Sequence, residues 1–218
     1  MPNEMIIQMK ALNNNLGRYS EPFPGNKEII NDITECCDYL SSLQTELPDS
    51  VGWFRLPFNM QDRANIGSCG SLAAYMIKYC AKPDPILVAS YLKPRIESIQ
   101  YGLIPAEVRS VLKTLLKPFG KCMDIPAETR QFVVDLLAIC PLKFQILCKI
   151  FKLAQLILEY GVVENGRMLP SALATIIKVS GGSEFSELTN YESAKIEISE
   201  WNIVWGMILE MNISILES

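Results

Sequence analysis

The sequence predicts an all-α fold, a single multi-helix domain of about eight or nine helices. Apolar residues recur at helical spacing in every long segment, and the alternating runs that are typical of β-strands are nearly absent. The 218 residues are 49% hydrophobic and 20% charged, which is the composition of a globular chain with a sizeable core. The length fits one large domain.

The predicted helices are segments of helical periodicity that begin or end at proline, glycine or polar residues. They cover residues 27–47, 72–80, 86–91, 106–116, 127–139, 142–160, 171–179 and 199–216. Residues 1–23 are polar and are interpreted as an N-terminal arm. The helical domain is therefore expected to span residues 24–218.

Two segments before the helix at 72–80 are interpreted as non-helical. Residues 51–58, with the sequence VGWFRLPF, are too short for a helix of their own and contain a proline, so we expect an extended loop. Residues 65–71 are rich in glycine and serine. Either Ser68 or Ser71 is the candidate N-cap of the helix that follows.

Three further signals set boundaries later in the chain. Pro94 is expected to act as a helix breaker. Gly161 lies just past the longest predicted helix, where a C-cap glycine belongs. The best candidate for a β-strand is the short segment of residues 195–199.

Composition excludes several classes of function. The chain has no histidine, which removes histidine-based metal sites, Ser-His-Asp and Cys-His catalysis, and a histidine general base. We find no phosphate-binding loop pattern, and no cofactor is expected. A net charge of −4 gives no indication of a nucleic-acid partner. The most hydrophobic region, residues 132–163, is interrupted by charged residues and a proline, so we expect no transmembrane segment.

Seven cysteines are present, an odd number, and none forms a C-x-x-C pair. Most of them lie in apolar segments, where a thiol behaves as a small hydrophobic group. We therefore expect reduced, structural thiols and a cytoplasmic location.

Four motifs, in order along the chain, resemble the Rho GTPase-activating protein (RhoGAP) domain family. They are Gly52-Trp53-Phe54-Arg55, then Pro83-Asp84-Pro85-Ile86, then Cys140-Pro141 before a long helix, and then Asn165, Met168 and Ala172-Leu173-Ala174. The predicted terminal helix, residues 202–216, is similar to the closing helix of the family. The resemblance covers residues 24–216 and implies the all-α RhoGAP fold.

This resemblance implies that Arg55 is an arginine finger, a guanidinium supplied in trans to a small GTPase. In such a site the GTPase holds the nucleotide, the metal and the water-orienting glutamine, and the finger adds about 10³ to 10⁵ in rate. Trp53 would pack beside the finger loop, and Phe54 and Phe58 would anchor it. The implied partner is a Rho/Rac-family GTPase in its GTP-bound form, in signal transduction, with this chain as activator rather than enzyme.

Several usual functional positions depart from the family pattern. The usual helix lysine and arginine fall on Met76 and Cys80, and the usual asparagine falls on Ala172. Lys78 is two residues from the lysine position, which is about 200° around a helix. Phe144 stands where another asparagine is usual. The candidate partner-binding residues are accordingly Trp53, Phe54, Met76, Lys78, Cys80 and Ala172.

Three hypotheses follow from the sequence. The chain is an active GTPase activator that uses Arg55, or a degenerate RhoGAP-like module that binds a GTPase or another partner with little catalysis, or a helical scaffold without related activity. A set of basic residues is interpreted either as a partner-facing patch or as a solvated face: Arg63, Lys78, Lys82, Lys93 and Arg95.

Overall fold

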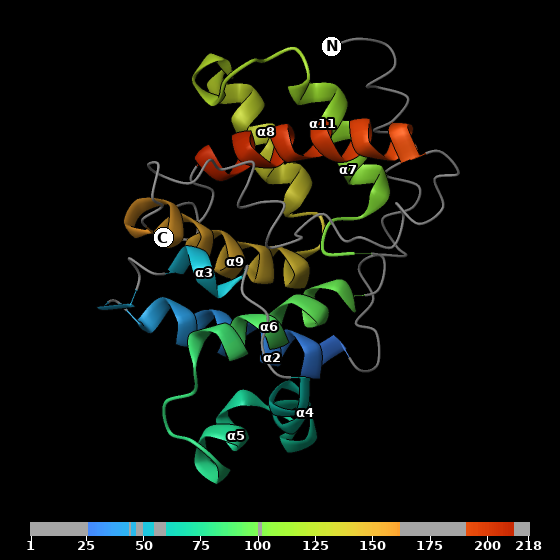
Figure 1. Ribbon diagram of the computed structural model, residues 1–218. Coiled ribbons are helices and arrows are strands. Elements are labelled where there is room, and N and C mark those ends of the chain that lie inside the picture. Colours follow the sequence, from blue (N-terminus) through green and yellow to red (C-terminus); the bar gives the residue numbers. More distant parts are fainter. Residues whose placement is uncertain are drawn as a thin grey trace.

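The computed structural model describes residues 26–43, 45–46, 50–54, 60–99, 102–161 and 191–211, and every regular element among them is a helix (Figure 1). The elements are α2 (Asn26–Ser42), α3 (Ser50–Trp53), α4 (Met60–Cys69), α5 (Leu72–Lys78), α6 (Pro85–Glu97), α7 (Ala106–Leu116), the 3₁₀-helix η3 (Cys122–Asp124), α8 (Ala127–Leu137), α9 (Pro141–Tyr160) and α11 (Tyr191–Glu210). The predicted all-α class is confirmed. The predicted N-terminal arm and the helix at 171–179 lie outside the described residues.

The helices form three levels, which Figure 1 shows from top to bottom. At the top, α11 crosses α7 and α8, and it packs on α7, η3 and α9. In the middle, α2 packs against both α6 and α9. At the bottom, α4 and α5 project below the α2–α6 pair. None of the helices in the described part of the chain is long and apolar enough to span a bilayer.

Helix α2 presents an apolar stripe to the core. Ile33, Cys36, Cys37 and Leu40 are at most 1% exposed. Their spacing of three, four and seven residues places them on one helix face. This face is covered by α6 and α9, which makes α2 the central helix of the lower two levels.

A polar network ties α2 to α6 within this core. Asp32 on α2 is only 3% exposed, and its Oδ2 accepts a hydrogen bond of 2.8 Å from the Tyr91 hydroxyl. Arg95 Nε lies 3.1 Å from the same oxygen, and the Arg95 guanidinium also donates to the Tyr91 oxygen. Burial raises the pKa of Asp32, although the Tyr91 hydrogen bond and the Arg95 charge oppose that shift. Burial is also the main cause that raises the pKa of Tyr91 to about 12.

Two predictions before α5 are wrong. Residues 51–58 are not extended throughout, because α3 forms a helical turn over Ser50–Trp53. The glycine- and serine-rich stretch belongs largely to α4, where Ile66 is fully buried. Tertiary packing of that side chain outweighs the weak helix propensity of the neighbouring glycine and serine. Of the two predicted N-cap candidates, Ser71 caps α5, and its hydroxyl accepts a hydrogen bond from Ala74 N. Ser68, the other candidate, lies within α4.

The predicted helix boundaries later in the chain agree with the structure only in part. The predicted bounds of α7 are confirmed, and those of α8 and α9 differ by one or two residues. Pro94 does not break α6 but lies inside it, at an exposed position. Residues 195–199 are helical, within α11. Gly161 is the C-cap of α9, but its φ of −67° is one that any residue adopts.

Replacing Asp32 with asparagine tests the buried network through its pH dependence. Because the folded-state pKa of Asp32 is raised, protonation of Asp32 stabilises the fold. This contribution is complete below the ordinary pKa of 3.8 and is lost as the pH rises through the folded-state pKa. We expect the free energy of unfolding of the wild type, minus that of Asp32→Asn, to decrease from pH 3.8 toward neutrality in urea titrations. Glu28→Gln, at an exposed position in the first turn of the same helix, is the matched control. A difference that stays constant or grows with pH would contradict a raised pKa of Asp32 in the folded state.

Candidate functional site

The candidate finger segment begins at the end of α3, where two aromatic side chains are buried. Trp53 is 4% exposed and Phe54 is 3% exposed. Helix α3 packs on α6 and α9, so these side chains anchor the chain to the middle level of the fold. Both side chains are therefore buried against the fold, as the anchoring role expected for Phe54 requires. Arg55 and Phe58 lie outside the described residues.

A lysine from α6 meets this anchor. Lys93 Nζ donates a hydrogen bond to the backbone carbonyl of Phe54, and it lies 6.0 Å from the centroid of the Phe54 ring. That carbonyl belongs to the peptide bond between Phe54 and Arg55. The last described group before the candidate finger is therefore held by a cation from a different helix.

Sequence reasoning missed this role of Lys93 and considered it only as part of a basic patch. The available signal was a lysine directly after the apolar run ILVASYL of α6, where Tyr91 and Leu92 are buried. A cation in such a run must reach solvent or an acceptor, because burying an unpaired ammonium is costly. The sequence does not reveal which acceptor it finds.

The predicted partner-binding residues on α5 lie at the other end of the fold. Met76 is half-buried and packs against the core, whereas Lys78 is exposed with its Nζ 4.8 Å from the centroid of the Tyr79 ring. Cys80 is exposed, and its Sγ donates to the Lys82 carbonyl at 3.1 Å. Met76 and Lys78 thus differ in exposure, as a separation of about 200° requires.

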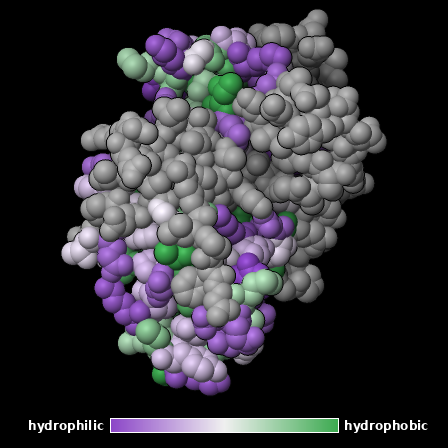
Figure 2. Space-filling model, in the orientation of Figure 1, coloured by the Kyte–Doolittle hydropathy of each residue, from purple (hydrophilic) through white to green (hydrophobic). Residues whose placement is uncertain are grey.

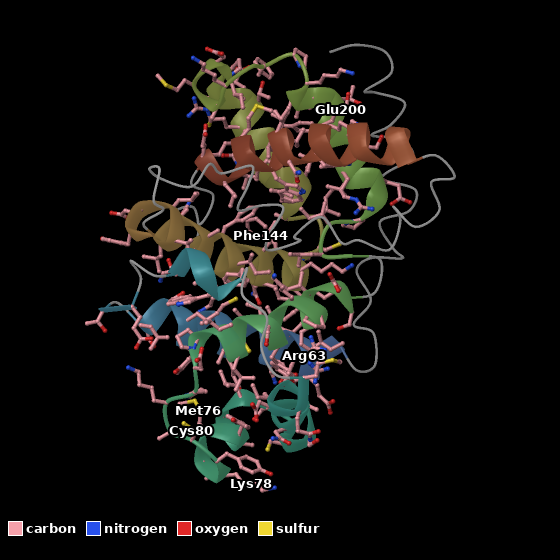
Figure 3. All side chains as sticks on the ribbon, viewed as in Figure 1. Arg63, Met76, Lys78, Cys80, Phe144 and Glu200 are labelled. Atoms are coloured by element: carbon pink, nitrogen blue, oxygen red, sulfur yellow. The ribbon has the colours of Figure 1, made fainter. Side chains whose placement is uncertain are left out.

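Figure 3 shows Met76, Lys78 and Cys80 at the lower end of the molecule, while Phe144 lies on α9 in the middle level. Helix α5 is below the α2–α6 pair and α3 is above it in the view of Figure 1. The structure therefore does not bring the α5 residues together with Trp53 and Phe54. Ala172, the last predicted partner-binding residue, lies outside the described residues.

The five residues of the candidate basic patch are divided among different environments. Arg95 pairs with buried Asp32, and Lys93 holds the Phe54 carbonyl. Lys82 Nζ lies 2.6 Å from Glu46 Oε1. Arg63 is half-buried on α4, and Lys78 lies exposed on α5. Because Lys93 and Arg95 point to intramolecular partners, these five residues do not form one positive surface.

All seven cysteines lie among the described residues, and none of them is in a disulfide. Five are buried: Cys36, Cys37, Cys122, Cys140 and Cys148. Burial raises the pKa of the Cys36, Cys37, Cys122 and Cys140 thiols, which disfavours the nucleophilic thiolate. Within the described ranges, no group of three cysteine, aspartate or glutamate side chains is placed to hold a metal ion.

Comparisons with protein-family models, with curated proteins and with solved structures find no match to this chain.

Alkylation of the native protein by iodoacetamide tests the arrangement of the thiols. We expect Cys80 to react first, because it is exposed, and Cys69 to react more slowly, because it is half-buried. The five buried cysteines should react only after denaturation. Mass spectrometry of the digested protein gives the extent of reaction at each position. Rapid labelling of Cys36 or Cys37 in the native protein would contradict the packing of α2.

Proposed function

We propose that this chain is a cytoplasmic RhoGAP-like module that activates a Rho/Rac-type small GTPase in its GTP-bound form. In this proposal Arg55 enters the nucleotide site of the partner and compensates the charge that develops on the phosphates during hydrolysis. Arginine suits this role because it is always charged and directs planar donors toward phosphate oxygens. The chain is then an activator and has no substrate of its own.

The observation that carries the proposal is the way the chain is held just before Arg55. A finger that acts in trans must enter the partner from a fixed base, because a misplacement of about 1 Å can cost about 10² in rate. Buried Trp53 and Phe54 and the bond from Lys93 to the Phe54 carbonyl supply such a base. These contacts support a finger at Arg55, where the sequence motif predicts one.

Lys93 also weakens an argument against catalysis. The departures at Met76 and Cys80 remove a lysine and an arginine that the family resemblance leads one to expect. In this chain a cation from α6 steadies the entry to the finger segment instead. The absence of charge at Met76 and Cys80 therefore does not by itself imply a loose finger.

The second candidate function is a RhoGAP-like module that binds a partner without much catalysis. It is favoured by the neutral side chains at Met76 and Cys80, and by the division of the basic residues among intramolecular partners. Kinetics separate this candidate from the first.

Arg55→Ala is the direct test of the proposed finger. We expect it to lower the acceleration of single-turnover GTP hydrolysis by about 10³-fold or more while leaving binding to the GTPase partly intact. The loss should be kinetic because the finger acts on charge that exists mainly in the transition state. Arg55→Lys should not restore the rate, because an ammonium lacks the planar fork of donors.

The measurement uses a panel of Rho-family GTPases with and without the chain. Lys121→Ala, at an exposed position before η3, is a control that should leave the acceleration unchanged. If the wild type binds a GTP-loaded GTPase but accelerates none, the binding module is the correct function. If Arg55→Ala keeps the full acceleration of the wild type, the finger is assigned to the wrong residue.

Lys93→Met tests the anchor while keeping a long apolar stem. We expect the maximal rate of GTP hydrolysis, reached at a saturating concentration of the chain, to fall about 10- to 100-fold. The concentration of the chain that gives half of this maximal rate should change less. Lys93→Arg keeps a donor and should restore part of the rate. Circular dichroism and the thermal midpoint report whether the variant is folded. Equal effects of Lys93→Met and Lys93→Arg on the rate would show that the donated hydrogen bond is not what matters.

A further inference from the structure

Helix α6 carries a proline in its interior, one residue after Lys93. Pro94 has no N–H, so the backbone carbonyl of Ser90 lacks the donor that an uninterrupted helix would give it. A helix bends most easily where its ladder of backbone hydrogen bonds is interrupted. The part of α6 that presents Lys93 to the candidate finger segment is therefore the part that most needs support from outside the helix.

Apolar packing supports α6 without fixing its rotation closely. Leu87, Val88 and Ala89 are consecutive, and each is at most 3% exposed. At about 100° per residue they cover about 200° of the helix circumference, which is more than half of it. Hydrophobic burial is also non-directional. Burial over so wide an arc leaves the rotation of α6 to be set by other contacts.

Two bonds to a single carboxylate oxygen supply this support. Tyr91 lies before Pro94 and Arg95 lies directly after it, and both contact Asp32 Oδ2, at 2.8 Å and 3.1 Å. The Arg95 guanidinium also donates to the Tyr91 hydroxyl oxygen, so the three side chains contact one another. Such bonds are directional. Asp32, Tyr91 and Arg95 thus form a clamp that holds α6 to α2 across the interruption at Pro94.

The clamp acts from inside the fold. Asp32 is 3% exposed and Tyr91 is 5% exposed. On the outside, Figure 2 shows hydrophobic and hydrophilic surface interspersed over the lower part of the molecule. Because two of the three members of the clamp are buried, it can influence a partner only through the helix that it holds.

Lys93 lies inside the clamped span, about 200° around the helix from Tyr91 and from Arg95. A rotation of α6 by about 20° would move its Cα atoms by about 0.8 Å, because they lie about 2.3 Å from the helix axis. A misplacement of about 1 Å can cost about 10² in rate. We propose that the clamp residues are positioning residues, which keep the Lys93 ammonium on the Phe54 carbonyl and so fix the start of the finger segment. The effect on rate rests on the proposed function, whereas the position of Lys93 can be measured without a GTPase.

Amine labelling of the native protein measures the position of Lys93. Trace amounts of N-hydroxysuccinimide acetate, followed by digestion and mass spectrometry at several times, give the acylation rate of each lysine. We expect Tyr91→Phe, which removes the hydroxyl and keeps the ring, to raise the rate at Lys93 about threefold or more relative to exposed Lys121, because the amine leaves its acceptor more often. Tyr39→Phe removes a tyrosine hydroxyl that donates to the Pro83 carbonyl, and it is the matched control that should leave Lys93 unchanged.

Pro94→Ala restores the backbone donor and provides a test that is specific to the clamp. Alanine has the highest helix propensity and the position is exposed, so α6 should accept the change. In the Pro94→Ala background, Tyr91→Phe should change the labelling of Lys93 little, because α6 is then supported by its own hydrogen bonds. If Tyr91→Phe raises the labelling as much there as in the wild type, α6 is not clamped across Pro94 and the inference is wrong.

The GTPase assay gives the second readout. We expect Tyr91→Phe to lower the maximal rate of GTP hydrolysis about tenfold, with less change in the concentration of the chain that gives half of this rate. In Lys93→Met, where the anchor is absent, adding Tyr91→Phe should lower the rate no further.

Three results would overturn the inference: wild-type labelling of Lys93 in Tyr91→Phe, an equal rise in labelling at buried Lys143 on α9, or a wild-type maximal rate in Tyr91→Phe. An equal rise at Lys143 would mean that the whole fold is loosened. If the wild type accelerates no GTPase while Tyr91→Phe raises the labelling at Lys93 and not at Lys143, the proposed function fails and the clamp on α6 stands.

Discussion

The burial of α2 between α6 and α9 is the constraint on which the rest of the structure depends. The buried stripe of α2 includes one carboxylate, Asp32, which requires a partner inside the core. Helix α6 supplies Tyr91 and Arg95, four residues apart and thus on one face. Directional bonds at both positions leave α6 little freedom to rotate or slide. Because Lys93 is about 200° around the helix from Tyr91 and Arg95, the same restraint directs it toward α3 and the Phe54 carbonyl.

The sequence predicts the helices best where apolar periodicity is long and a proline precedes it. Both conditions hold for α7 and α9, whose observed bounds agree with the prediction or differ by a residue. It fails for α3 and α4, which are short and poor in helix-forming residues. These two helices are stabilised by the side chains that they bury, Trp53 and Ile66, against helices distant in sequence. Tertiary contacts of this kind produce no periodic pattern in the local sequence.

The candidate site was predictable in part for the same physical reason. Burial of Trp53 and Phe54 follows from their hydrophobicity, and the sequence indicated it correctly. The bond from Lys93 to Phe54 joins residues 39 apart through a backbone carbonyl, and every residue has a backbone carbonyl. No residue type at either position marks such a pair. Likewise, nothing in the sequence reveals that Arg95 is neutralised by Asp32 while Lys78 is exposed to solvent.

The contacts that an arginine makes within the fold indicate whether it can act on a partner. An arginine that acts in trans must leave no buried group unpaired behind it. Arg95 fails this condition because its withdrawal would strand the carboxylate of Asp32 in the core. Arg130 donates to two backbone carbonyls at η3, and Arg109 is only 4% exposed. These three arginines have structural duties, which leaves Arg18, Arg55, Arg63 and Arg167 as candidates for the proposed finger. Of these four, Arg55 follows a helix whose buried aromatic residues fix where its segment begins.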